Sequence, residues 1–402
     1  MFDLEAIRAA ETNLKGRFRR TELIYSHHFS ERLGYSLYFK CENLQRTGSF
    51  KIRGALNFLD KQPPALLRNG LITASAGNHA QGVAFAATQA KIPSLVVMPE
   101  NTPIAKILAT RDYGAEVRLH GVNYDEATVL ARQLEKDLEM LYVPAFDHEL
   151  IMAGQGTVGL EIMADLADAD TLVVPIGGGG LIAGVATAAK GIRPDIRIVG
   201  VEAASAPAAL LSRQAGAITT LAAARSLADG IALKQVGTLT FPVIEALVDE
   251  IVTVEEEEIA HAIVGLMEKS KLVVEGAGAV GLAALLYGKP GVASGKTVVI
   301  LSGGNIDVQT ISRVVERGML AEGRFLMIRI ELDDSPGALA RLAALVAELG
   351  ANIFHVSHDR RNTGVPLGQA EVHLELETKG PEHIGEILTG LRDAGYGASV
   401  LH

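Results

Sequence analysis

The segment TLVVPIGGGGLIAGVA, residues 171–186, decides the fold. It begins with a continuous apolar run, which is typical of a strand buried on both faces, and after four glycines it reads as a helix. Further short apolar runs are separated by lengths that suit helices, and they lie at residues 36–40, 71–75, 94–99, 115–121, 196–202 and 296–304. This alternation predicts an α/β fold of the doubly wound type.

The composition narrows the class of protein. The chain has 402 residues, of which 48% are hydrophobic and 21% charged, as in a globular protein of two or three domains. The net charge of −10, without a basic stripe or tail, predicts no nucleic-acid or membrane partner. No apolar run reaches transmembrane length, and the N-terminus lacks the apolar stretch of a signal peptide. Because Cys41 is the single cysteine, an intramolecular disulfide is excluded and we expect a cytoplasmic location.

The pattern changes near residues 316–325. Beyond them, strand-like and helix-like segments follow in the order βαββαβ, which predicts a small ferredoxin-like unit.

Glycine-rich or polar loops follow several of the predicted strands, as SAGNHAQG at 75–82, GGGG at 177–180 and SGGN at 302–305. The carboxyl ends of parallel strands meet at one edge of a sheet, so we expect these loops to form one ligand site.

The four-glycine loop brings bare N–H groups to a helix N-terminus, which predicts a phosphate site. Gly178, Gly180 and Ala183 also satisfy a loose dinucleotide pattern, with Glu202 at the spacing of a ribose-binding acid. A nicotinamide-dependent dehydrogenase is therefore an alternative, and a simple strand-to-helix turn is another.

Two further loops carry residues that could bind a ligand or take part in catalysis. The turn that precedes the helix after 71–75 can form an anion nest for a carboxylate, although a capped helix start is the simpler interpretation. Its residues are Ser75, Ala76, Gly77, Asn78 and His79.

In GSFKIRGA, residues 48–55, Ser49 is predicted to cap a helix that sets Lys51 between Phe50 and Ile52. Burial lowers the pKa of a lysine, which makes the neutral amine available to attack a carbonyl. A lysine whose head reaches water is the alternative.

Taken in order, GSFKIRGA, SAGNHAQG, GGGG and LSGGN resemble the pyridoxal-phosphate enzymes of the tryptophan-synthase β fold, also called fold type II. The resemblance covers residues 15–318 and is closest to the threonine dehydratases, or threonine ammonia-lyases. The remainder resembles an ACT domain. The resemblance implies two doubly wound α/β subdomains in a catalytic domain over 1–320, the smaller at about 52–150, and an ACT-like regulatory domain over 325–402.

The same resemblance implies roles for the residues of these motifs. Lys51 would hold pyridoxal phosphate as a Schiff base and move the substrate's Cα proton. The loop from Ser75 to His79 would hold the substrate carboxylate. The remaining cofactor contacts would be Phe50 against the ring, Asn78 at the 3-hydroxyl, Ser302 at the ring nitrogen, and Gly177, Gly178, Gly179 and Gly180 at the phosphate.

Serine, unlike aspartate, cannot hold a charged ring nitrogen, so Ser302 implies a weak electron sink that favours β-elimination. The implied reaction converts threonine to 2-oxobutanoate and ammonia, and serine to pyruvate. A dehydratase of another hydroxy amino acid, such as 3-hydroxyaspartate, and a non-catalytic amino-acid sensor are alternatives. Ala76 occupies the position at which the related serine racemases carry a second serine, and this argues for elimination rather than racemisation.

No metal is expected. Some relatives place a divalent cation near Glu202, but Ala208 lies where an aspartate ligand would be needed. His355 and His358 fall in a predicted strand without metal-type spacing.

The C-terminal unit suggests regulation by an amino acid. Gly337 would open a helix N-terminus toward a carboxylate, Asp334 could bind an ammonium group, and Asn352 lies on the next strand. By resemblance the effector is isoleucine or valine, bound where two copies meet in a homo-oligomer, a dimer or tetramer. The alternative is that this unit only dimerises the enzyme.

Overall fold

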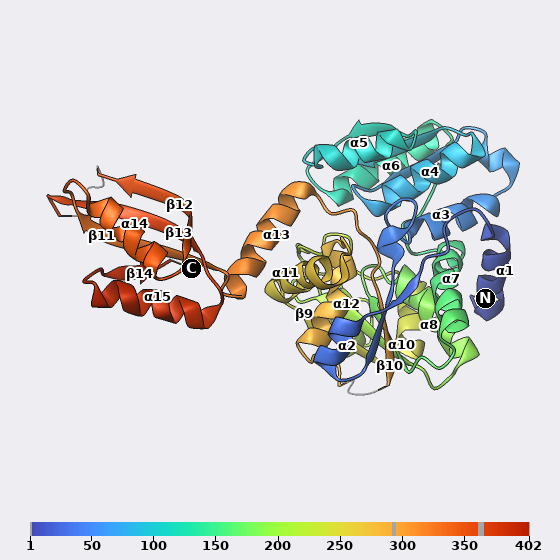
Figure 1. Cartoon of the computed structure of the whole chain (residues 1–402). Helices are drawn as coiled ribbons and strands as arrows, with labels where there is room; N and C mark the ends of the chain where they lie inside the picture. The colour runs from blue at the N-terminus through green and yellow to red at the C-terminus, as the bar shows by residue number, and fades with distance from the viewer. Residues whose placement is uncertain (1, 292–294, 361–365, 402) are drawn as a thin grey trace. The chain divides into compact units, whose positions relative to one another are not determined.

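The computed structural model describes residues 2–291, 295–360 and 366–401. The chain forms two compact units, Met1–Ile311 and Ser312–His402, and the helix α13 (Val308–Ala321) spans the boundary between them (Figure 1). The domain limits expected from the sequence stay predictions.

The first unit is built on a six-stranded sheet with the order β1-β2-β10-β7-β8-β9. Strand β1 is antiparallel to β2 and the other neighbours are parallel. Every residue of β7 is buried, as its continuous apolar sequence predicts. The strands are β1 (Leu23–Tyr25), β2 (Ser36–Lys40), β7 (Thr171–Pro175), β8 (Arg197–Ala203), β9 (Glu250–Val254) and β10 (Lys296–Ile300).

A smaller parallel sheet in the same unit has the order β5-β4-β3-β6. Its helices pack against its strands and make a separate layer in Figure 1. The elements are β3 (Leu71–Ala74), α4 (Asn78–Ala90), β4 (Ser94–Met98), α5 (Ile104–Asp112), β5 (Glu116–Leu119), α6 (Tyr124–Asp137) and β6 (Leu141–Tyr142).

All seven predicted strands of this unit are confirmed, whereas β1, β6 and β9 were not predicted. Two of these have only three and two residues, too few to show a period. The remaining helices of the unit are α1 (Leu4–Leu14), α2 (His27–Leu33), η1 (Glu42–Leu44), α3 (Lys51–Asp60), η2 (Pro64–Leu67), α7 (Glu149–Asp165), α8 (Gly180–Ile192), α9 (Ala208–Ala215), α10 (Thr240–Leu247), α11 (Glu256–Gly265), η3 (Leu266–Ser270) and α12 (Gly276–Leu286).

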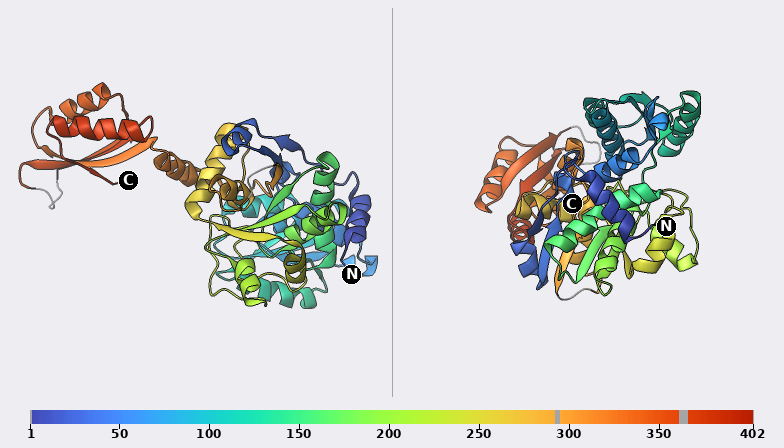
Figure 2. Two further views of the ribbon diagram at one scale, coloured as in Figure 1. Left: turned by 90° about the horizontal axis from the view of Figure 1, so that it is seen from below. Right: turned by 90° about the vertical axis from the view of Figure 1, so that its right-hand side faces the viewer.

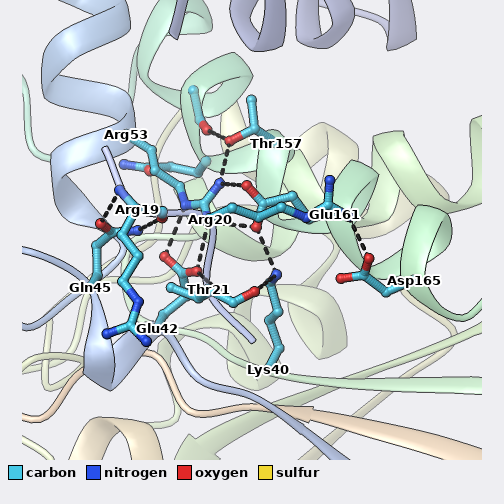
Figure 3. A network of polar contacts seen from close by, with 12 residues as sticks. Arg19, Arg20, Thr21, Lys40, Glu42, Gln45, Arg53, Thr157, Glu161 and Asp165 are labelled. Atoms are coloured by element: carbon cyan, nitrogen blue, oxygen red, sulfur yellow. Dashed lines mark hydrogen bonds and ion pairs between the residues drawn. The ribbon is translucent and has the colours of Figure 1, made fainter. Parts of the chain in front are cut away.

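A buried network of charged side chains fixes the helix that carries Lys51 (Figure 3). Arg53 on α3 contacts Glu42 of η1 and Glu161 of α7, each at 2.7 Å. Glu161 also accepts from Lys40 at the end of β2, at 2.6 Å. Two positive and two negative groups therefore balance inside the protein, and they tie the start of α3 to three other elements.

The second unit has the predicted βαββαβ order, which confirms the ferredoxin-like expectation. Its four strands are antiparallel in the order β12-β13-β11-β14, and both helices pack on one face through a shared apolar core (Figure 2). The elements are β11 (Phe325–Asp333), α14 (Ala338–Glu348), β12 (Asn352–Asp359), β13 (Gln369–Glu377), α15 (Pro381–Asp393) and β14 (Ala398–Val400). Strand β12 lies at an edge of the sheet and is mostly exposed.

Candidate active site

A cavity of about 270 Å³ lies at the carboxyl ends of β3, β7 and β10. The structure brings together around it all the residues of the first unit that the sequence singled out for cofactor and substrate. They are Phe50, Lys51, Ser75, Ala76, Gly77, Asn78, His79, Gly177, Gly178, Gly179, Gly180 and Ser302.

Lys51 is the first residue of α3, and its Nζ donates to the carbonyl oxygen of Ala145 at 3.0 Å within the cavity. Burial lowers its pKa to about 8, against the opposing effect of the Glu275 carboxylate. At pH 7 about a tenth of such amines is neutral, against roughly 0.03% for an ordinary lysine. The amine therefore lies in the cavity with the properties that a nucleophile needs.

The helix α3 starts differently from the prediction. Phe50, not Ser49, occupies the N-cap position. The backbone of Ser49 instead pairs with Gly303, and the N–H of Phe50 donates to the carbonyl oxygen of Ser302 at 3.2 Å. Predicting Ser49 as the cap was wrong because these long-range backbone contacts hold the segment before Lys51. They also join the two residues before Lys51 to the loop of Ser302.

The four-glycine loop requires its glycines. Gly179 has a φ of +93°, and a Cβ at Gly178 would overlap the ring of Phe146. A Cβ at Gly177 would lie 2.9 Å from the Cα of Ile231. Among the described residues, none of the backbone N–H groups of 177–180 donates to a protein acceptor. Unpartnered donors at the N-terminus of α8 fit a phosphate group.

In the loop before α4, the groups available to a carboxylate in the cavity are backbone N–H groups rather than the His79 ring. The Nε2 of His79 lies 3.0 Å from the carbonyl oxygen of Val143, and burial, together with the charge of Lys51, lowers its pKa to about 3. The His79 ring is therefore neutral and bonded to the backbone of Val143, so it carries no charge for a substrate carboxylate. The N–H of Gly77 is bonded to the Ser75 hydroxyl at 3.2 Å, which shapes the turn at the start of α4.

Three charged groups and one aromatic residue at the cavity were not found from the sequence. Phe146 packs against the glycine loop, and Glu275 accepts a hydrogen bond from Asn78. Lys106 of α5 contacts Asp229 at 2.5 Å, and both line the cavity. Only the order of polar loops after strands was visible in the sequence, and these residues lie outside such loops.

The donor set fits pyridoxal phosphate. The cavity offers a lysine with a lowered pKa, a row of free N–H groups for a phosphate, and the Ser302 hydroxyl at the end of β10. Each of these groups matches a different part of that cofactor.

Glu202, weighed above as a cation ligand or a ribose-binding acid, has a structural partner. Its carboxylate accepts from the N–H groups of Ala209 and Leu210 at 2.7 and 2.8 Å, at the start of α9. Burial raises its pKa to about 7. Within the described parts of the chain, no cluster of three or more metal-type side chains is found.

In the second unit the structure separates the three residues predicted for an effector. Gly337, with a φ of +86°, precedes α14, and Asp334 binds Arg360 through two contacts of 2.8 Å. The strand register places Asn352 beside Glu377, at the opposite end of the sheet from Asp334. Within one chain these residues do not form one site, because the nine residues of β11 lie between Asn352 and Asp334. The effector site expected where two copies meet stays a prediction.

Comparison with known proteins agrees with the geometry. Residues 14–303 match the family described as pyridoxal-phosphate dependent enzyme, and 326–393 match the ACT domain. The chain is 59% identical over 401 residues to an L-threonine ammonia-lyase of Geobacter sulfurreducens, covering 100% of both. It is 46% identical over 396 residues to an L-threonine ammonia-lyase of Thermotoga maritima, covering 98% of both. The solved structure of maize serine racemase aligns with a TM-score of 0.74 at 34% identity, over 80% of this chain and 99% of that one.

The chain belongs to the pyridoxal-phosphate-dependent enzymes of fold type II, and it carries an ACT domain. The two relatives from Geobacter sulfurreducens and Thermotoga maritima, which match it over nearly their whole length, are named L-threonine ammonia-lyases. The predictions of this family, of its fold, of pyridoxal phosphate and of a lyase are confirmed. A nicotinamide-dependent dehydrogenase and a non-catalytic sensor do not fit these relatives. Of the helices that the structure describes, none combines the length and apolar character needed to cross a membrane.

Proposed function

We propose that this enzyme eliminates water from β-hydroxy amino acids and that the dehydrated product then takes up water and releases ammonia. L-threonine is the first substrate and L-serine the second. The products are 2-oxobutanoate or pyruvate. The observation that carries the proposal is Lys51, whose amine with a lowered pKa shares a cavity with the free N–H groups of the glycine loop. The names of two relatives that match the chain over nearly its whole length support threonine as the substrate.

When bound, pyridoxal phosphate supplies a sink for the electron pair left on the substrate's Cα. The chain's own residues do the rest. In the loop at 75–79, the N–H groups of Ser75 and Gly77 have protein acceptors, so those of Ala76, Asn78 and His79 would bind the substrate carboxylate. Lys51 takes the Cα proton. Ser302 lines the cavity and would face the ring nitrogen. As a neutral hydroxyl it would not hold a charge there, which would favour expulsion of the β-hydroxyl over protonation elsewhere.

Ala76 supports elimination rather than racemisation. It lines the cavity and offers no group that can exchange a proton. Racemisation requires a proton donor on each face of Cα, and Lys51 acts on one face.

The test is turnover on threonine, serine and 3-hydroxyaspartate, read as released 2-oxo acid, with Lys51→Ala as the inactive control. We expect the highest kcat/KM for threonine. A higher value for 3-hydroxyaspartate would overturn the substrate, and wild-type turnover by the control would overturn the mechanism.

The ACT domain supports a second proposal, modulation by isoleucine or valine between two chains. Within the described residues, the edge strand β12 pairs with β13 alone. If β12 pairs antiparallel with its copy, Asn352 of the partner subunit comes to the Asp359 end of the strand. The Arg360–Asp334 ion pair and Gly337 lie at that end. Two copies thus reunite the residues that one chain separates, and we propose a dimer or tetramer. The buried free thiol of Cys41 supports a cytoplasmic location.

A further inference from the structure

Glu275 is a carboxyl group at the cavity that the mechanism above does not use. It directly precedes α12, yet its side chain does not cap that helix. It is 6% exposed, and its Oε1 accepts a hydrogen bond from Nδ2 of Asn78 at 2.6 Å. The side chain could accept from the N–H groups at the start of its own helix, but it accepts from the Asn78 amide instead. The Asn78 amide therefore determines where the carboxyl group lies.

The direction of this contact is fixed by a chain of amides. The Nδ2 of Asn305 donates to the carbonyl oxygen of Thr47 at 2.8 Å, and a carbonyl oxygen can only accept. Asn305 must therefore present its nitrogen on this side, where it also donates to Oδ1 of Asn78 at 2.8 Å. The oxygen of Asn78 is thus engaged by Asn305, and its nitrogen must face Glu275. One N–H of Asn78 binds the carboxylate and the other is left for the cavity.

The backbone holds Glu275 in place. Its N–H donates to the carbonyl oxygen of Gly303 at 3.1 Å. A Cβ at Gly303 would overlap the Glu275 carboxylate and lie 3.0 Å from Nδ2 of Asn78. The glycine of the SGGN loop is therefore required because the carboxylate and the amide fill the space beside it.

Charged groups on other elements act on Glu275. Burial and the nearby Asp229 raise its pKa, whereas the Asn78 hydrogen bond, Lys106 and Lys51 lower it, and the result is about 7. The carboxyl group is consequently able to change its charge near neutral pH, one hydrogen bond away from Asn78.

We propose that Glu275 is a positioning residue that orients the Asn78 amide toward the 3-oxygen of the cofactor and supplies the negative charge facing Lys51. The inference rests on the proposed roles of Lys51 and Asn78. A glutamine at 275 can still accept from Asn78, whose orientation Asn305 fixes, but its neutral oxygen accepts a weaker hydrogen bond than a carboxylate does. It also removes the charge that favours a positive group at Lys51.

The experiment is a pH titration of the visible absorbance of the holoenzyme between pH 5.5 and 8.5. The wild type is expected to show a spectral change with a midpoint near pH 7, and Glu275→Gln is expected to lose it. The matched control, Asp229→Asn, removes a carboxylate at the same cavity without touching Asn78. Because Asp229 raises the pKa of Glu275, this control should keep the change and move its midpoint to lower pH.

A second variant separates position from charge. Glu275→Asp keeps the carboxylate but shortens its reach to Asn78, and it should weaken cofactor binding by about tenfold, the effect of one ordinary hydrogen bond. An unchanged titration in Glu275→Gln together with unchanged cofactor affinity in Glu275→Asp would overturn the inference while leaving the proposed function intact. If borohydride fixes no cofactor on Lys51 even in the wild type, the proposed function fails as well.

Discussion

Replacing Arg53 with methionine should destabilise the first unit strongly. Arg53 is fully buried and donates five hydrogen bonds, two to Glu42, two to Glu161 and one to Thr157. Its guanidinium also lies 4.4 Å from the ring of Phe18. Burial alone would lower the pKa of Arg53, but the two carboxylates outweigh this effect and raise it. Without Arg53, two buried carboxylates share Lys40 as the remaining cation of the network.

The expected cost is about 3–5 kcal/mol, because removing one partner of a buried ion pair leaves an uncompensated charge. In urea this should lower the unfolding midpoint by roughly 1 M. The absorbance of the bound cofactor is the suitable signal, because it reports on the first unit alone. The turnover number should fall too, since the network ties the start of α3, where Lys51 lies, to η1 and α7.

Two controls make the test sharp. Arg8→Met removes the exposed Arg8–Glu5 pair, whose side chains are 54% and 75% accessible, and should cost 0 to about 1 kcal/mol. Adding Glu42→Gln to Arg53→Met restores the charge balance, so the double variant should recover about 1–3 kcal/mol. If Arg53→Met is no more harmful than Arg8→Met, the network does not hold α3 and this reasoning is refuted.

Three further outcomes are expected. Ala76→Ser should introduce racemisation of serine beside dehydration, which chiral chromatography of the residual substrate would detect. Unchanged optical purity would show that Ala76 is not what prevents racemisation. Burial would raise the pKa of Glu161, but Arg53 and Lys40 outweigh this effect and lower it. The stability that the ionised Glu161 contributes to the fold is therefore present above the ordinary pKa of 4.5 and is lost as the pH falls below it. Unfolding midpoints measured from pH 7 to pH 3 should decline more steeply in the wild type than in Glu161→Gln. Asn352→Ala should weaken the response of turnover to isoleucine or valine without changing uninhibited kcat, and an equal response would exclude Asn352 from an effector site.

The sequence predicted the elements and loops well because their signals are local. A run such as residues 171–175 is apolar throughout, and the glycines that follow it need no partner to be noticed. Topology then assembled these loops, since the carboxyl ends of parallel strands share one edge. What the sequence could not supply is register. Asn352 opens β12 after a turn and Asp334 directly follows β11, and only the pairing of β11, β12 and β13 shows that they lie at opposite ends of the sheet.

Buried charges escaped prediction for a related reason. A charged residue in a sequence is normally exposed, and it is buried only when an ion-pair or hydrogen-bond partner compensates for the lost water. Glu275 depends on Asn78, which is 197 positions away, and Arg53 depends on Glu161 at a separation of 108. Neither partner leaves a local trace, so GAGAVG after Glu275 reads as an unremarkable apolar helix. Each pair nevertheless supports a residue on which the chemistry depends. Arg53 lies two residues from Lys51, and Glu275 binds Asn78. The groups that position this active site are therefore the ones that require the folded chain to be recognised.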